Sequence, residues 1–476
     1  MSQPPLTPSY LRSLPSIRQR SSLVYSLARQ DKLQHFTLHE DKLDTVVDYC
    51  IRVIKRDYGE DYEKIPGHSR WRHFVTPQRG DLLGEVIEGW QGEEKGEGQG
   101  VGRLSYMHHF GQLSTAGAGP TWKYLYEPTG ELIGRSEGLA VASLDMFLSG
   151  AFSSSSSASS TSSSNSTSTS NSNGANKDKE LRVDSIALKN LTTQTIRSGL
   201  QGETMTGLEG RAGLLIRLGE ALEARPEVFK DPQGVFRPGN MVDYLYPDST
   251  NETQTSTSTE TEPTGSATKK IQVGKLWEVV MDGFGPIWPS SERTNLEGVS
   301  LGDAWKCGVL AQEEPEVGDA AGIVPFHKLS QWMTYSLMEP LQKILGVEIE
   351  GVEQMTGLPE YRNGGLLLDL GFLVLKNNKF GEWHRSAKYD TPPSTPSERW
   401  TPRETVDSQT VIEWRALTVI ALDKIAQRIR EKLNAPDLST AQVLEAATWK
   451  AGREVAKELR EGGGPPIEIV SDGTVF

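Results

Sequence analysis

The stretch TVIEWRALTVIALDKIAQRIREKL, residues 410–433, decides the class of fold. Its first half is apolar nearly all round, which is typical of a helix that is buried on every side. The same half carries Glu413 and Arg415 into this apolar setting. The stretch therefore predicts a central buried helix, and its two charged residues are candidate functional residues.

Two further stretches have clear helical patterns. In DKLDTVVDYCIRVIKRDY, residues 41–58, apolar residues recur at three- and four-residue steps and form one stripe opposite the charges. The stretch STAQVLEAATWKAGREVAKELR begins at Ser439 with a Ser-x-x-Gln capping box and ends before a GGG stop. Strand signals are short and scarce, as in FLVLKNN and PIEIVSDGTVF. The sequence thus predicts a mainly helical fold with a few short strands.

Two low-complexity tracts divide the chain. Residues 153–180 are rich in Ser, Thr and Asn, and residues 248–269 in Thr, Ser and Glu. Neither tract has enough apolar surface to offset the entropy of ordering, so both are expected to be disordered insertions. The tracts separate an N-terminal helical part, a middle helical segment and a C-terminal part, at residues 1–152, 181–247 and 270–476.

Composition excludes several classes of protein. The formal net charge of -13 repels a phosphate backbone, so nucleic acid is not an expected partner. Cys50 and Cys307 have no CxxC or Cys/His ligand spacing, which argues against a disulfide framework and a structural zinc site. No apolar run is long enough to span a membrane, and no signal-peptide pattern opens the chain. We therefore expect a cytoplasmic protein with no membrane partner.

Familiar catalytic motifs are missing from the sequence. It contains no GxGxxG, GxxxxGK[ST], GxSxG or HExxH, which disfavours the common nucleotide-binding and hydrolase folds. His108 and His109 are adjacent, so they cannot face one metal from the same side of a helix, and no metal is expected. The run HSRWRHF, residues 68–74, could hold an anion through its arginines and histidines, or could surround a packed Trp71 and Phe74.

Two neighbouring segments concentrate polar side chains. In VPFHKLSQWMTYSLMEPLQKILG, residues 324–346, Lys328, Gln331 and Tyr335 share one helical face. That face could present an amine, an amide and a phenol to a polar ligand. The alternative is a solvated stripe beside a core stripe.

The second segment is GVEQMTGLPEYRNGGLLLDLGFLV, residues 351–374. Pro359 suits the first turn of a helix, so Glu360 would lie near a helix N-terminus, where the dipole favours an ionised carboxylate. The Gly364 and Gly365 pair lowers helix stability without an obvious local reason. A fixed carboxylate in an apolar setting is what an oxocarbenium-like transition state needs. The alternative is an acid that only caps the helix.

Over nearly the whole chain outside the two tracts, the sequence resembles the uracil catabolism protein 4 family. The segments that carry the resemblance are SRWRHF at 69–74, AGAGPTW at 116–122, RSEGLAVASLDMF at 135–147, GLEGR at 207–211, RPGNMVDYL at 237–245 and TGLPEYRNGGLLLDLG at 356–371. The resemblance implies a role in an oxidation-independent route of uracil breakdown, with urea and a ribosyl compound among the products. The family has an aspartate immediately before AGAG, whereas this chain has Thr115.

The C-terminal half is also similar to the queuosine nucleotide N-glycosidase family. The similarity rests on FHKLSQW around Lys328, EQMTGLPEYR, IEWR at 412–415 and Trp449. That family has an Asp-Tyr-Arg triplet where this chain has Glu360, Tyr361 and Arg362. The similarity implies a helical fold that resembles helix-hairpin-helix DNA glycosylases.

Together, the resemblances imply a cofactor-independent hydrolase that cleaves the N-glycosidic bond of a ribosylurea or its 5-phosphate and releases urea. Glu360 would stabilise the cationic sugar or guide water, and Lys328 and Arg362 would hold a phosphate or hydroxyls. Tyr244 and Trp277 would wall the base-side pocket. The further substrate-binding candidates are Tyr361, Asp243, Glu413 and Arg415.

Two other functions fit the same sequence. One is a hydrolase that attacks the amide of an opened pyrimidine rather than the sugar bond. The other is a non-catalytic protein that senses a pyrimidine metabolite, which the departure at Thr115 favours. The expected partner of the proposed enzyme is a small ribosyl or nucleotide-like molecule, and the sequence leaves the oligomeric state open.

Overall fold

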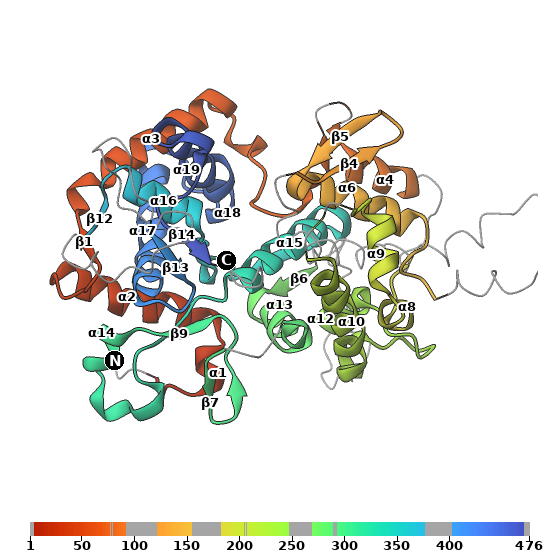
Figure 1. Ribbon diagram of the computed structural model, residues 1–476, viewed down its shortest axis with the longest axis horizontal. Coiled ribbons are helices and arrows are strands. Elements are labelled where there is room, and N and C mark those ends of the chain that lie inside the picture. The colour runs from red at the N-terminus through yellow and green to blue at the C-terminus, as the bar shows by residue number, and fades with distance from the viewer. Residues whose placement is uncertain are drawn as a thin grey trace, which may run out of the picture. The chain divides into compact units, whose positions relative to one another are not determined.

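The computed structural model describes residues 4–76, 78, 80–91, 121–154, 182–203, 205, 207–246, 269–288, 293–376 and 402–470 (Figure 1). This part of the chain is mainly helical, with only short strands, so the predicted fold class is confirmed. The pair His108 and His109, Thr115, and nearly all of the two low-complexity tracts lie outside the described residues. None of the helices in the described ranges is both long and apolar enough to cross a bilayer.

The chain forms two compact units, and neither is contiguous in sequence. Unit 1 consists of Met1–His68, Ser290–Tyr335 and Glu353–Phe476, and unit 2 of Ser69–Pro289 and Ser336–Val352. The predicted middle segment, 181–247, falls within unit 2, whereas the predicted N-terminal and C-terminal parts each contribute to both units. Helix α15 (Lys328–Leu345) gives its residues up to Tyr335 to unit 1 and the rest to unit 2.

Helix α17 (Gln409–Leu433) is the central helix of unit 1, as its apolar sequence predicts. Its residues from Thr410 to Leu422 are all buried, and it contacts α2 (Leu14–Arg29), α3 (Leu43–Tyr58) and α16 (Tyr361–Asp369). The capping box at Ser439 is confirmed, because its hydroxyl accepts from the Gln442 N–H and the Gln442 side chain accepts from the Ser439 N–H. The other α-helices that lie wholly within the described part of the unit are α1 (Pro8–Leu11), α14 (Gly308–Gln312), α18 (Thr440–Val443) and α19 (Trp449–Leu459).

Within the described residues, the strands of unit 1 form two-stranded pairs rather than one sheet. Three pairs are antiparallel: β1 (Phe36–Leu38) with β12 (Leu373–Leu375), β7 (Asn295–Leu296) with β8 (Val299–Ser300), and β9 (Ala304–Lys306) with β10 (Ile323–Pro325). One pair is parallel, β13 (Arg403–Thr405) with β14 (Glu468–Val470). The strand signals FLVLKNN and PIEIVSDGTVF are thus confirmed at β12 and β14.

Unit 2 is built around α10 (Leu208–Ala224), which contacts α8 (Ser185–Lys189), α9 (Thr193–Gly199) and α11 (Pro226–Phe229). Among the described residues, its other α-helices are α4 (Leu82–Gln91), α6 (Arg135–Leu148), α12 (Met241–Leu245) and α13 (Val273–Glu278). Its strand pairs are β2 (Val75–Thr76) with β3 (Gly80–Asp81), β4 (Lys123–Tyr126) with β5 (Glu131–Gly134), and β6 (Lys270–Gln272) with β11 (Glu348–Glu350).

Glycines allow α16 to pack closely between α17 and α19. A Cβ atom at Gly364 would lie 2.7 Å from the Trp414 ring of α17, and a Cβ at Gly365 would lie 3.1 Å from Pro466. A Cβ at Gly452 of α19 would overlap the carbonyl oxygen of Arg362. The Gly364 and Gly365 pair, which has no local explanation in the sequence, is therefore required by tertiary packing.

We expect Gly452→Ala to destabilise the protein by about 1–3 kcal/mol, because the added methyl must push α19 away from the Arg362 backbone. Thermal or chemical unfolding measures this change. The control is Gly210→Ala, in α10, where a Cβ would meet nothing within 4 Å and the lower entropy of the unfolded chain should stabilise slightly. Equal stability of the two variants would show that the α16–α19 contact is looser than described.

Candidate functional site

Glu360 is the N-cap residue of α16. Its side chain accepts a hydrogen bond from the Asn363 N–H at 2.8 Å, and the residue is 8% exposed. The helix begins at Tyr361, so Pro359 precedes the cap instead of lying in the first turn as predicted. The carboxylate is thus held at a helix N-terminus in a largely buried place, and it stabilises the helix whatever else it does.

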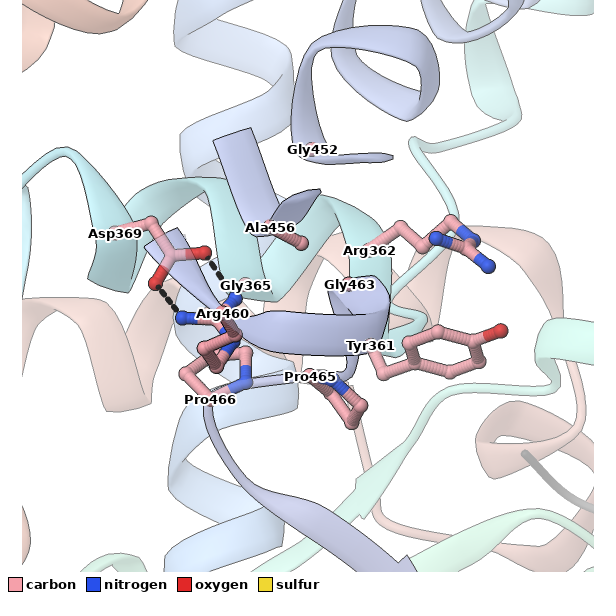
Figure 2. Close-up of a pocket in the computed structure, with 10 residues that line it drawn as sticks. All are labelled: Tyr361, Arg362, Gly365, Asp369, Gly452, Ala456, Arg460, Gly463, Pro465 and Pro466. Carbon is pink, nitrogen blue, oxygen red and sulfur yellow. Dashed lines mark hydrogen bonds and ion pairs between the residues drawn. The ribbon is translucent and has the colours of Figure 1, made fainter. Parts of the chain in front are cut away.

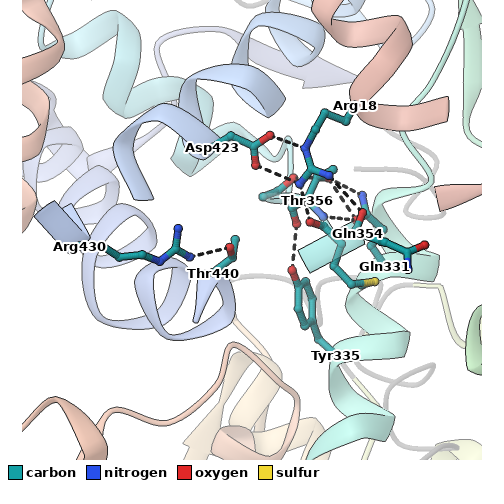
Figure 3. Close-up of polar contacts among 10 residues, drawn as sticks. Arg18, Gln331, Tyr335, Gln354, Thr356, Asp423, Arg430 and Thr440 are labelled. Atoms are coloured by element: carbon teal, nitrogen blue, oxygen red, sulfur yellow. Dashed lines mark hydrogen bonds and ion pairs between the residues drawn. The ribbon is translucent and has the colours of Figure 1, made fainter. Parts of the chain in front are cut away.

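The segment that leads to Glu360 is fixed by the polar face of α15 (Figure 3). The Gln331 side chain exchanges hydrogen bonds with the backbone N–H and hydroxyl of Thr356, and the Tyr335 hydroxyl donates to the Thr356 carbonyl at 3.1 Å. Arg18 donates to the Met355 carbonyl at 2.8 Å and pairs with Asp423. The amide and phenol that the sequence offered as ligand contacts therefore position the backbone before Glu360.

Asp303 links α15 and α17 beside this segment. It accepts two hydrogen bonds of 2.7 Å from the Arg415 guanidinium and one of 3.0 Å from the Lys328 N–H. Arg415 also donates to the Pro359 carbonyl at 3.4 Å and lies over the Phe326 ring. This buried pair brings Arg415, Lys328 and the residue before Glu360 into one cluster.

The electrostatics of this cluster favour an ionised Asp303. Burial by itself raises the pKa of Asp303, but the Arg415 charge and the hydrogen bonds from Arg415, the Lys328 N–H and Trp305 lower it to about 2. Sequence reasoning missed Asp303, because its partner Arg415 is 112 residues away in the chain and the acid stands in no motif. The only available signal was the buried arginine itself, which needs a counter-charge.

Aromatic and cationic side chains surround the first turn of α16. The Arg362 guanidinium lies 5.1 Å from the centre of the Tyr361 ring and 5.6 Å from that of Trp449, and Arg453 lies 5.7 Å from the same Trp449 ring. All four residues are partly exposed. Burial and the neighbouring Glu360 raise the pKa of Tyr361, so its hydroxyl stays protonated and can donate a hydrogen bond. A planar or anionic ligand could contact this surface.

A small hollow borders Tyr361 and Arg362 (Figure 2). It contains about 180 Å³ of empty space, part of it open to solvent. Figure 2 shows the Tyr361 and Arg362 side chains pointing away from the ion pair between Asp369 and Arg460 at the other end of the hollow. Pockets for whole ligands usually measure about 300–1,000 Å³, so this hollow is too small to enclose a nucleotide-sized molecule.

Other predicted site residues have different surroundings. The Glu413 carboxylate is fully buried and accepts hydrogen bonds from the Gln34 and His35 backbone N–H groups, so it holds the start of β1.

Three further predicted residues belong to unit 2: Asp243, Tyr244 and Trp277. Asp243 is exposed, the Tyr244 carbonyl accepts from Lys275, and Trp277 is 4% exposed. Their substrate-binding roles stay predictions.

The run HSRWRHF divides between the two units. His68 belongs to unit 1 and its Nδ1 lies 2.7 Å from a Glu445 carboxylate oxygen. His73 belongs to unit 2 and its Nδ1 lies 3.7 Å from a Glu137 carboxylate oxygen. Each histidine therefore has its own carboxylate partner, which the sequence did not predict. Among the residues that the structure describes, no three histidine, cysteine or carboxylate side chains gather as a metal centre would require.

The fold and the site define a mainly helical protein with a buried carboxylate beside a cationic and aromatic surface. The chain belongs to the family described as Protein of unknown function (DUF1688), whose model matches residues 10–476. It is 36% identical over 478 residues to Uracil catabolism protein 4 of Lachancea kluyveri, covering 98% of each chain. It is also 36% identical over 480 residues to Protein urg3 of Schizosaccharomyces pombe, covering 99% of each chain.

Proposed function

We propose that this protein acts in uracil catabolism by hydrolysing the N-glycosidic bond of a ribosylurea or its 5-phosphate. The observation that carries the proposal is the buried Glu360 carboxylate, held next to the partly exposed Tyr361 and Arg362. The name of the Lachancea kluyveri relative, and the length over which the two chains match, support the assignment to uracil catabolism.

The chemistry of the bond explains why this carboxylate matters. When nitrogen leaves the anomeric carbon, positive charge develops on the sugar, and a fixed carboxylate stabilises that charge more than the neutral ground state. A fixed carboxylate needs no reorganisation during the reaction, and both the Asn363 N–H and the tethered segment 354–359 hold Glu360. Glu360 would also orient the attacking water.

Binding is assigned to the cations around the same helix. Arg362 would hold a phosphate or the sugar hydroxyls through its planar guanidinium, and Trp449 would provide an apolar surface beside it. Lys328 would supply a second positive charge, because Asp303 fixes its backbone in the same cluster as Arg415. Since Arg415 is bound by Asp303 at both terminal nitrogens, we assign it to positioning the Pro359 backbone.

The experiment is to incubate the purified chain with ribosylurea, ribosylurea 5-phosphate, uridine monophosphate and queuosine monophosphate, and to assay each released base. We expect urea from one or both ribosylureas and no release from the other two compounds. Release of ammonia without urea would favour attack on the amide instead. Binding of a ribosylurea without any turnover would favour a sensor. Release of no base from any of the four compounds would contradict the N-glycosidase assignment.

A further inference from the structure

A buried histidine and glutamate pair lies next to the surface formed by Arg362 and Trp449. His68 is 4% exposed and Glu445 is 5% exposed, and the distance from His68 Nδ1 to Glu445 Oε2 is 2.7 Å. The His68 backbone N–H also donates to the Ala441 carbonyl, and the Gln442 amide donates to the Ile65 carbonyl. The imidazole is therefore held in place both by its backbone and by its ring.

Two tryptophans flank the imidazole. The Trp332 ring stacks on His68 at an interplanar angle of 22°, with 6.2 Å between ring centres, and Trp449 lies at the same distance with a tilt of 50°. Both indoles are partly exposed, so the buried imidazole is close to solvent-facing aromatic surface. Glu445 occupies Nδ1, and within the described ranges no residue makes a hydrogen bond to Nε2. Nε2 is thus the ring nitrogen that remains for a ligand.

A widened helical turn places Glu445 and Trp449. Residues Leu444–Thr448 form a π-helix (η13) between α18 and α19, with Glu445 inside it and Trp449 directly after it. Such turns interrupt α-helices rarely and are frequent at functional sites. Trp449 contacts both His68 and Arg362, and Arg362 is two residues after the Glu360 cap of α16.

We infer that His68 is the general acid that protonates the leaving nitrogen, with Glu445 as its positioning residue; the inference rests on the proposed function. A urea nitrogen is a poor leaving group as an anion, so cleavage requires a proton donor. Histidine is the side chain whose ordinary pKa lies nearest neutrality, whereas the neighbouring Arg362 and Arg453 hold their protons too strongly to serve. A carboxylate on Nδ1 orients the ring and stabilises the imidazolium, as in other histidine–carboxylate pairs.

The proposed hydrolysis breaks one bond to C1′ and forms another. The C1′–N bond breaks, its electron pair goes to nitrogen, and the proton on His68 Nε2 moves to that nitrogen, so that neutral urea leaves. Water forms the new C1′–O bond and gives its proton to Glu360. Exchange with solvent then returns the proton to His68 and removes it from Glu360. Glu360 and His68 therefore have separable roles, one on the sugar and one on the leaving group.

His68→Gln tests the assignment with two substrates that differ in their leaving groups. Ribosylurea needs a proton on its leaving nitrogen, whereas 4-nitrophenyl β-D-ribofuranoside releases a stable anion that needs none. We expect a loss of turnover of about a hundredfold or more on ribosylurea and little change on the nitrophenyl riboside. Glu360→Gln should slow both substrates, and His39→Gln, at a histidine whose side chain is 43% exposed, is the matched control that should slow neither.

Glu445→Gln provides a second test of whether His68 is the general acid. This test still applies if His68→Gln does not fold or if the nitrophenyl riboside is not turned over. Turnover that depends on a general acid falls on the alkaline side of the pH profile. Removing the Glu445 charge disfavours the imidazolium, so this fall should move to lower pH. Arg362 and Arg453, which lie over the Trp449 ring that contacts His68, keep their charges in the variant.

The outcomes separate the two proposals. An active wild-type protein in which His68→Gln loses nothing, or loses equally on both substrates, overturns the role of His68 and leaves the proposed function standing. An alkaline fall that does not move in Glu445→Gln overturns it as well. A wild-type protein that releases no urea from ribosylurea or its 5-phosphate overturns both.

Discussion

Glu360→Gln is expected to lower the turnover of ribosylurea by about a hundredfold or more and to change its affinity little. In the proposed reaction, glutamine would remove the charge that stabilises the cationic sugar but keep the size of the side chain. Its amide oxygen can still accept the hydrogen bond from the Asn363 N–H, so the cap of α16 should survive. In the proposed reaction, Arg362 and Lys328 would still hold the other end of the substrate. Steady-state kinetics with urea detection measures both quantities.

The matched control is Asp184→Asn, which makes the same change from acid to amide at the N-cap of α8 in unit 2. A carboxylate at a helix N-terminus contributes about 0.3–1 kcal/mol to stability through the helix dipole, so Glu360→Gln should melt slightly lower. Asp184→Asn should melt lower still, because it also loses the charge that pairs with Arg182 at 3.4 Å. Only Glu360→Gln should lose turnover. A fully active Glu360→Gln protein would reduce Glu360 to a helix cap.

Asp303→Ala is expected to destabilise the protein by about 3–5 kcal/mol, because it leaves the Arg415 guanidinium buried without its counter-charge. The side chains of Arg415 and Asp303 are 1% and 13% exposed. Chemical unfolding measures the change. The control is Glu454→Ala, which breaks the exposed pair with Arg56 and should cost about 1 kcal/mol or less. Equal losses in the two variants would contradict the structural importance of the Asp303 and Arg415 pair.

The same pair predicts a dependence of stability on pH. The pKa of Asp303 is lower in the folded protein than its ordinary value of 3.8. Its contribution to stability is therefore complete above that value and is lost as the pH falls toward about 2. The difference in unfolding free energy between wild type and Asp303→Ala should shrink between about pH 6 and about pH 3. A constant difference over this range would show that Arg415 does not lower the pKa of Asp303 in the folded protein.

Local patterns allowed most of the fold to be predicted from the sequence. The apolar stripe of α3, the all-round apolar character of α17 and the capping box at Ser439 each depend on residues within a few positions. The π-helical turn at Leu444–Thr448 was not predicted, because its sequence reads as an ordinary helix. The reason for Gly364 lies in Trp414, which only the packed structure brings near.

The site was less predictable, because its polar groups find partners far away in the sequence. Glu360 was correctly placed near a helix N-terminus from Pro359 and the residues that follow. By contrast, Gln331 and Tyr335 have the helical spacing of a ligand-binding face, yet they bond to Thr356. Asp303 was missed for the same reason, because only its contact with the distant Arg415 distinguishes it from other acidic residues. The spacing of residues in the sequence identifies which side chains share a helical face. Only the tertiary structure shows whether that face contacts a ligand or another part of the chain.

The carbonyl carbon of ribosylurea distinguishes cleavage of the sugar–nitrogen bond from attack on the amide. The purified chain is incubated with ribosylurea labelled with carbon-13 at the carbonyl, and the products are identified by NMR spectroscopy. Cleavage of the sugar–nitrogen bond predicts that the label appears in intact urea, together with free ribose, and that Glu360→Gln forms both slowly. Label in bicarbonate with release of ammonia, or a label that stays in ribosylurea, would contradict the account.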